Sequence, residues 1–167
     1  IVNNPKPVIA EVNGTATAAG CQLVASCDLA YASKTATFAT PGVNIGLFCS
    51  TPMVAVSRNA SNKHSMEMLL TGDLISATKA EKIGLINKVV DESLLKKETM
   101  ETAKKISKKS AITLKIGKEA FYKQIDMTLS EAYDYASDVM VQNMLKLDAE
   151  EGINAFINKR TPSWKDK

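Results

Sequence analysis

The sequence holds few of the side chains on which metal sites and histidine-dependent catalysis rely. It has one histidine, His64, and three cysteines, Cys21, Cys27 and Cys49, among its 167 residues. The cysteine spacings fit no zinc or redox-pair motif, and a single histidine does not complete a common metal site. We therefore expect no metal ion, an exposed position for His64, and three buried free thiols in a reducing compartment.

Long apolar runs are also missing. No stretch approaches the length of about 18 residues that a membrane-spanning helix needs, so the sequence predicts no membrane span. The net charge of +3 is too small to indicate an acidic partner by itself. No internal repeat, low-complexity segment or long linker interrupts the chain. With 45% hydrophobic residues, the chain can bury one sizeable core.

Acidic side chains are absent from a long central stretch. No aspartate or glutamate stands between Asp28 and Glu67, where Thr40, Cys49 and Ser50 lie instead. A thiol acts as a base only when its pKa falls well below its free value of about 8.5. For Cys49 we expect a buried small residue rather than a catalytic group.

The chain is organised around its first third. An apolar strand is predicted over Pro7–Val12, a helix over Ala19–Ser26 and a second strand over Leu29–Ala32. This order predicts two parallel strands joined by a crossover helix. The small residues Ala16–Gly20 would bring backbone N–H groups together at the start of the helix. Such a point can hold an anion, or an oxygen that becomes one during a reaction.

Helical signals dominate the rest of the sequence. Thr51-Pro52 predicts a helix start with threonine as the N-cap, and Thr128-x-x-Glu131 has the spacing of a capping box. We therefore divide the chain into an α/β part over residues 1–90 and a helical part over residues 91–167.

The α/β stretch resembles the enoyl-CoA hydratase/isomerase (crotonase) family. The family pattern is an apolar strand followed by Asn-Gly, Ala, three small residues, Cys, an acid and Leu. The matching residues are Asn13, Gly14, Ala16, Ala18, Ala19, Gly20, Cys21, Gln22 and Leu23. The likeness continues in one register to Thr161-Pro162. The segments Thr17–Leu23 and Phe48–Pro52 resemble one particular branch of the family.

The resemblance implies a crotonase-like α/β fold, in which a spiral of β-β-α units is followed by helices that build a trimer. A homotrimer or a hexamer is therefore expected. The front part of that fold, with its earlier strands and a CoA-contacting loop, is missing from the sequence, so we expect a fragment or a short isoform. The resemblance also implies a mitochondrial location, or otherwise a cytoplasmic one, although no targeting segment is present.

The resemblance further implies an acyl-CoA thioester as ligand, within fatty-acid metabolism. The N–H of Ala19 would form half of an oxyanion hole, and Lys159 would contact the phosphate or adenine side of CoA. The substrate-binding positions carried over from the family are Ala16, Ala18, Ala19, Pro41, Asn44, Cys49, Phe156 and Lys159. Coenzyme A enters as part of the substrate, so no separate cofactor is expected.

Two positions depart from the family's hydratases, which hold glutamates where this sequence has Gln22 and Gly42. Hydration needs one group to accept a proton and one to donate it, and each contributes roughly 10²–10⁴ in rate. We therefore expect no ordinary hydratase activity, and a gain when both glutamates are restored in an intact pocket. The alternatives are an enzyme that relies on enolate stabilisation, as in decarboxylation or isomerisation, and a non-catalytic acyl-CoA-binding or structural member.

Basic residues gather in one stretch. Between Leu94 and Ile125, nine lysines and three glutamates give a charge of +6. These lysines are Lys96, Lys97, Lys104, Lys105, Lys108, Lys109, Lys115, Lys118 and Lys123. One branch of the resembled family binds RNA through a lysine-bearing helix, which leaves an RNA-binding member as a further alternative. Because no aromatic residues suited to base stacking are interleaved, we favour a solvated helix face, and we expect no DNA partner.

Overall fold

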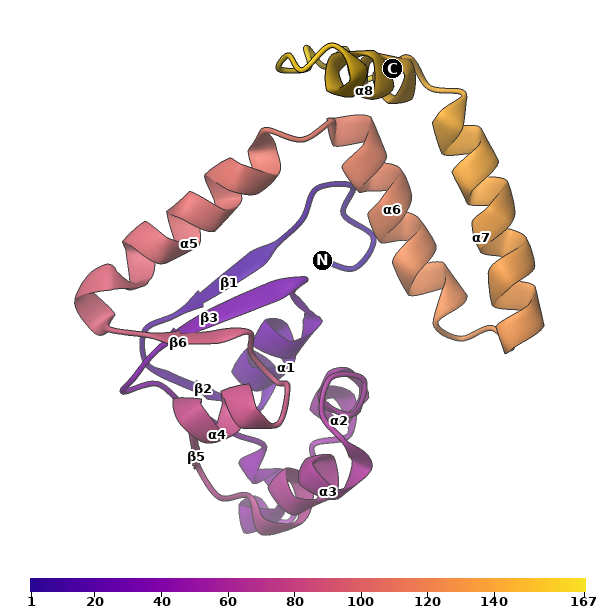
Figure 1. The fold of residues 1–167 in the computed structure, drawn as a ribbon. Helices are drawn as coiled ribbons and strands as arrows, with labels where there is room; N and C mark the ends of the chain where they lie inside the picture. The colour runs from indigo at the N-terminus through magenta and orange to yellow at the C-terminus, as the bar shows by residue number, and fades with distance from the viewer. The chain divides into compact units, whose positions relative to one another are not determined.

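The computed structural model describes residues 1–167 and forms two compact units (Figure 1). The first unit comprises Ile1 and residues 8–103, and the second comprises residues 2–7 and 104–167. The boundary between them falls inside helix α5 (Glu92–Ser107). None of the eight helices combines the length and the apolar character needed to cross a bilayer.

One sheet of the first unit contains three parallel strands. Strand β3 (Leu29–Ser33) lies between β1 (Ile9–Val12) and β6 (Lys88–Val90). Ile9 pairs with Leu29, and all pairs in this sheet run parallel. Helix α1 (Ala19–Ser26) lies between β1 and β3 in the chain. The predicted parallel strands and the predicted helix are confirmed.

The candidate site begins where two strands of a second small sheet end. Strand β4 (Thr37–Ala39) pairs in parallel with β2 (Thr15–Thr17) and antiparallel with β5 (Ile75–Ser76). Thr17 pairs with Ala39, so β2 and β4 end side by side. The residues that follow these two strand ends therefore begin next to each other.

Short helices complete the first unit. They are the 3-10 helix η1 (Pro41–Ile45), α2 (Ser50–Ser57), α3 (Asn62–Thr71) and α4 (Ala77–Lys82). The prediction that Thr51 is the N-cap of α2 is wrong, because the helix begins at Ser50 with Cys49 as its N-cap. Pro52 then occupies the third helical position. Proline is tolerated there because the first N–H groups of a helix have no intrahelical acceptor.

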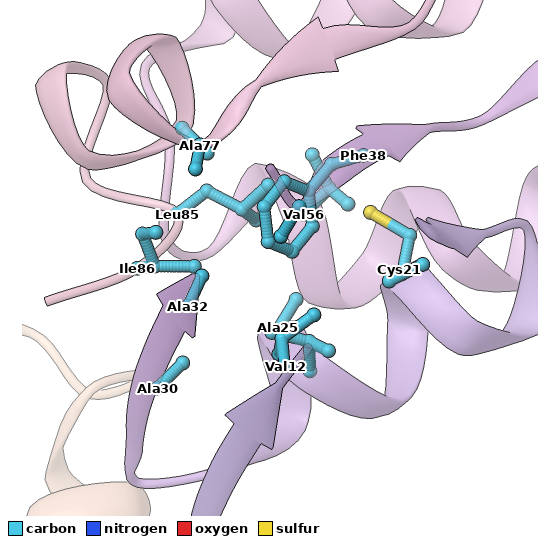
Figure 2. Packing of buried hydrophobic residues seen from close by; sticks show 14 of the residues in the cluster. Val12, Cys21, Ala25, Ala30, Ala32, Phe38, Val56, Ala77, Leu85 and Ile86 are labelled. Atoms are coloured by element: carbon cyan, nitrogen blue, oxygen red, sulfur yellow. The ribbon is translucent and has the colours of Figure 1, made fainter. Parts of the chain in front are cut away.

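The core of the first unit is built largely from small side chains (Figure 2). The elements β1, α1 and β3 contribute Val12, Cys21, Ala25, Ala30 and Ala32. Later parts of the chain contribute Phe38 of β4, Val56, Ala77, Leu85 and Ile86. Many alanines in a core let backbones approach closely, and close packing transmits small displacements. The surrounding segments therefore pack closely against the backbone of the strands and the helix next to the candidate site.

The cysteines are buried at two of the three positions. Cys21 is fully buried and Cys49 nearly so, but Cys27 is only half-buried. The prediction for Cys27 is wrong because this residue is the C-cap of α1, where the chain leaves the core-facing helix. Burial, with a smaller effect of Cys49, raises the pKa of the Cys21 thiol to about 11, so this sulfur stays protonated.

The second unit is helical. It contains α6 (Ala111–Gln124), α7 (Leu129–Met144) and α8 (Leu147–Ile157). The capping box predicted at the start of α7 is confirmed. The Thr128 N–H donates to the Glu131 carboxylate at 3.0 Å, and the Glu131 N–H donates to the Thr128 hydroxyl at 3.5 Å.

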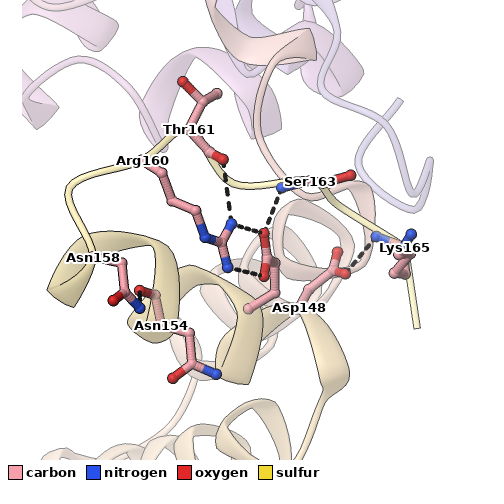
Figure 3. A network of polar contacts seen from close by, with 8 residues as sticks. Asp148, Asn154, Asn158, Arg160, Thr161, Ser163 and Lys165 are labelled. Atoms are coloured by element: carbon pink, nitrogen blue, oxygen red, sulfur yellow. Dashed lines mark hydrogen bonds and ion pairs between the residues drawn. The ribbon is translucent and has the colours of Figure 1, made fainter.

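The C-terminal tail is tied to this helical unit by polar contacts (Figure 3). The Asp148 carboxylate is 2% exposed and accepts the Lys165 N–H at 2.7 Å. The Trp164 indole donates to the Lys108 carbonyl at 2.8 Å. The Ala111 N–H, at the start of α6, donates to Asp166 at 2.7 Å. The tail is therefore an ordered part of this unit.

Candidate functional site

The turn between β2 and α1 has a strained backbone. Ala18, which directly precedes α1, has φ 47° and ψ −115°, a combination that favours glycine. Its N–H donates to the Ala39 carbonyl at 3.0 Å, and its own carbonyl accepts the Gln22 N–H at 3.0 Å. Residues held in such conformations cost about 1–3 kcal/mol and cluster at functional sites. The sequence did not predict this strain, because alanine, unlike glycine, is not typical of positions with positive φ.

The N–H of Ala19 is free to meet a ligand. Ala19 is exposed, is the first residue of α1, and donates no hydrogen bond to a protein acceptor. The first N–H groups of a helix carry partial positive charge and lack intrahelical acceptors. The position predicted for an oxyanion donor therefore has an available donor. The neighbouring Ala16 is buried in β2, opposite Phe38 of β4, so its side chain belongs to the core.

Gln22 lies on the first turn of α1 and is half-buried. Its side-chain amide makes no hydrogen bond within the protein. Its backbone carbonyl accepts a hydrogen bond from the Ser26 hydroxyl at 2.8 Å. A glutamine amide offers two donors and one acceptor but no titratable proton near neutral pH. The side chain can therefore orient a polar ligand without exchanging a proton with it.

Gly42 lies in a closed loop that leaves no space for a side chain. Its N–H donates to the Cys49 sulfur at 3.3 Å, and its carbonyl accepts the Leu47 N–H at 2.9 Å. A Cβ at this position would lie 2.6 Å from the Leu47 carbonyl oxygen and 2.9 Å from the Cys49 sulfur. A glutamate at residue 42, on which the predicted gain of hydratase activity depends, would therefore require this loop to move.

Two further predicted positions lie on η1. Pro41 is its half-buried first residue, and Asn44 is exposed. The Asn44 side chain lies close to Gly72, the left-handed C-cap of α3, because a Cβ at Gly72 would be 3.0 Å from the Asn44 side-chain nitrogen. Asn44 therefore borders the end of α3 as well as the loop that contains Gly42.

Thr40 is a polar residue whose role the sequence did not indicate. It follows β4 directly and is fully buried, and its hydroxyl has no hydrogen-bond partner. Native proteins leave few buried polar groups unsatisfied, and an internal water is a common partner. The burial of this hydroxyl depends on tertiary packing, so no pattern in the sequence reveals it.

Phe156 and Lys159 belong to the second unit. Phe156 lies on α8 and is 85% exposed, an unusual position for a large aromatic side chain. Lys159 follows the helix with φ 51°, and its ammonium has no ion pair or hydrogen bond. Both side chains are thus available to a ligand or to another subunit.

The remaining candidate groups show little sign of catalysis. His64 lies on α3 and is half-buried rather than fully exposed, with 41% of its side chain accessible, and its Nδ1 lies 3.4 Å from the Glu67 carboxylate. Hydrogen bonds from His64 and Lys79 hold the pKa of Glu67 below its usual value. No group of three or more His, Cys, Asp or Glu side chains is gathered where it could hold a metal ion.

Sequence reasoning also missed a cavity of about 700 Å³ in the second unit. It is lined by Val2, Asn3, Asn4, Pro5, Lys115, Glu119, Tyr122 and Lys123. Its walls come from segments more than 100 residues apart in the sequence, and this separation explains why no local pattern predicts it.

Comparison with known proteins identifies the family to which this chain belongs. The family model for enoyl-CoA hydratase/isomerase matches residues 1–167. The chain belongs to the enoyl-CoA hydratase/isomerase family, and the crotonase-like fold is confirmed. A crystal structure of human enoyl-CoA hydratase domain-containing protein 3 is 55% identical, with a TM-score of 0.96 over 98% of this chain and 65% of that chain. An enoyl-CoA hydratase structure from Mycobacterium smegmatis also gives a TM-score of 0.96, with 49% identity over 98% of this chain and 64% of that one.

Sequence relatives point to the same branch. The chain is 57% identical over 164 residues to mitochondrial enoyl-CoA hydratase domain-containing protein 3 of Mus musculus, a match that covers 98% of this chain and 55% of the relative. The mitochondrial enoyl-CoA hydratase of Pongo abelii is 36% identical over 97% of this chain and 56% of its own length. The chain spans about half the length of the curated relatives it matches. The predicted branch and the mitochondrial location are confirmed.

Proposed function

We propose that this protein binds an acyl-CoA thioester in mitochondrial fatty-acid metabolism and does not catalyse ordinary hydration. The observation that carries the proposal is the free N–H of Ala19 on the strained turn before α1. An N–H at a helix start is suited to a thioester oxygen, which gains negative charge when the acyl group becomes an enolate. Losing one donor of this kind typically costs about 10²–10³ in rate.

The lack of acid–base groups limits the chemistry of this site. Gln22 has no titratable proton near neutral pH, and Gly42 has no side chain and no room for one. The buried Cys21 thiol, with its pKa raised to about 11, does not supply a base. A reaction that depends chiefly on enolate stabilisation fits these residues better than the addition of water. Acyl-CoA binding without turnover fits them equally well.

Two side chains of the second unit also suit a CoA moiety. We propose Phe156 and Lys159 as contacts of CoA, because the first is an exposed aromatic side chain and the second is an unpaired cation. An aromatic face and an ammonium suit an adenine and a phosphate respectively. We also propose a homotrimer or a hexamer, since α7 and α8 expose many large apolar side chains. Coenzyme A would enter only as part of the ligand.

Two measurements on the full-length protein test this function. The first is the affinity for butyryl-CoA, measured by isothermal titration calorimetry, where micromolar binding is expected. The second is hydration of crotonyl-CoA, followed by loss of enoyl-thioester absorbance, where a rate several orders below that of ordinary hydratases is expected. Absence of butyryl-CoA binding would refute the proposal, and so would hydration at an ordinary rate.

A further inference from the structure

The connection between β1 and β2 joins strands of two different sheets. Strand β1 pairs with β3 in one sheet, and β2 pairs with β4 in the other. Only Asn13 and Gly14 lie between the end of β1 at Val12 and the start of β2 at Thr15. The Gly14 carbonyl already accepts the Thr37 N–H at 3.4 Å. The connection is therefore short and is fixed at both ends by sheet pairing.

Both residues of this connection are exposed and carry unengaged polar groups. The Asn13 side-chain amide and the Gly14 N–H make no hydrogen bond within the protein. Gly14 does not have a positive φ, and a Cβ there would meet nothing within 4 Å. Neither the backbone conformation nor the packing therefore requires glycine at this position. What the glycine provides is a backbone nitrogen with no side chain beside it.

An unhindered backbone nitrogen that follows an asparagine can attack the side chain of that asparagine. Asn13-Gly14 is the only Asn-Gly pair in the chain. The Gly14 nitrogen gives up its proton and forms a bond to Asn13 Cγ, the bond from Cγ to Nδ2 breaks, and the side-chain nitrogen takes up a proton and leaves as ammonia. Water then opens the resulting succinimide ring at either carbonyl. One product has aspartate at residue 13, and the other has isoaspartate, in which the main chain runs through the side-chain carboxyl and is longer.

We propose that Asn13 is a modification site, at which this connection converts asparagine into aspartate or isoaspartate while the protein remains folded. Both products add a negative charge near neutral pH. Isoaspartate also lengthens a connection whose ends are fixed, and the displacement falls on β2, which leads directly into the strained turn at Ala18. The lengthened form therefore loosens the pairing of β2 with β4 beside the candidate site. This inference does not depend on acyl-CoA binding.

Peptide mapping by mass spectrometry follows the conversion in the full-length protein, incubated at mildly alkaline pH. Asn13 should convert faster than Asn44, which is also exposed but is followed by the bulky Ile45. The rate should rise with pH, because the attacking nitrogen must lose its proton. Gly14→Ala is the matched variant, since its new Cβ meets nothing within 4 Å and leaves the fold intact. The added methyl group crowds the nitrogen and should slow the conversion about tenfold, a barrier higher by about 1.4 kcal/mol.

Low concentrations of guanidinium chloride show whether the folded protein reacts. Below the unfolding transition only the small unfolded fraction rises, so the conversion rate should stay the same. A rate that follows the unfolded fraction would overturn the inference, and so would conversion of Asn13 no faster than that of Asn44, or equal rates in wild type and Gly14→Ala. Wild-type protein aged until isoaspartate accumulates should have a lower urea midpoint than Gly14→Ala treated in the same way. Equal midpoints after full conversion would refute the effect on β2.

Discussion

The N–H of Gly42 donates to the sulfur of Cys49 at 3.3 Å, and this contact closes the loop that follows η1. The sulfur lies where a side chain at residue 42 would begin, 2.9 Å from an ideal Cβ. In the resembled hydratases a glutamate stands at this position. The Cys49 sulfur therefore occupies space next to Gly42 that a side chain at residue 42 would need.

Gly42→Ala is expected to lower the free energy of unfolding by about 1–3 kcal/mol, because the new Cβ overlaps the Leu47 carbonyl oxygen at 2.6 Å. Urea denaturation measures the effect. Gly14→Ala is the control, since a Cβ there meets nothing within 4 Å. Equal stability of Gly42→Ala and wild type would mean that the loop is loosely packed. By the same argument, Gln22→Glu with Gly42→Glu should not produce hydratase activity unless this loop moves.

Ala18→Gly is expected to stabilise the protein by about 1 kcal/mol. The native φ of 47° strains alanine by about 1–3 kcal/mol, and the entropy that glycine loses on folding offsets part of that gain. Ala32→Gly, in the buried strand β3, should destabilise instead, because its conformation is an ordinary strand. Urea midpoints compare the two variants. A loss of stability in Ala18→Gly would contradict the strained turn.

Ala19→Pro should remove the proposed oxyanion donor. It should also disturb the turn, because proline restricts the backbone of the preceding residue, Ala18, which has φ 47° and ψ −115°. Isotope-edited infrared spectroscopy of bound butyryl-CoA reports on the hydrogen bond to its thioester carbonyl. In the wild type the carbonyl frequency should fall below that of free ligand, and in Ala19→Pro it should return toward it. Ala19→Gly keeps the N–H and should behave as the wild type. An unshifted frequency in the wild type would show that this N–H faces elsewhere.

The Glu151–Arg160 pair makes stability dependent on acid pH. Hydrogen bonds from Arg160 and from the Ser163 N–H lower the pKa of Glu151 from 4.5 to about 2. Because the folded pKa is lower than the unfolded one, this contribution is complete above about pH 5 and is lost as pH falls toward 2. Urea midpoints measured over this window should fall less steeply in Glu151→Gln than in wild type. Parallel curves would show that the carboxylate is not stabilised in the folded state.

The apolar surface of α7 and α8 predicts self-association. Met140 is 60% exposed and Leu145 is 74% exposed, too much for two large side chains on a unit without partners. Met140→Lys with Leu145→Lys should shift the full-length protein toward monomer in sedimentation velocity at micromolar concentration. Leu23→Lys, at an exposed position on α1, is the control and should not. A wild-type protein that sediments as monomer would exclude the proposed trimer.

Local patterns in the sequence predicted much of the fold. The apolar runs gave β1 and β3, the small residues and the following apolar stretch gave α1, and Thr128 with Glu131 gave the start of α7. These signals depend on neighbours within a few residues, so they can be read without a structure. The start of α2 was misplaced by two residues, because proline fits several positions of a first turn.

The sequence alone determined the family, the parallel strands, and the residue types available at the candidate site, including the absence of acids around Cys49. Only the tertiary structure decided how those residues can act. The strain at Ala18, the buried hydroxyl of Thr40 and the lack of space at Gly42 each depend on chain segments that pack against them. The left-handed turn at Lys159 is likewise followed by an ion pair that joins Arg160 to Glu151, nine residues earlier on α8. A sequence fixes which atoms are present, whereas distances between segments remote along the chain arise only when the core closes.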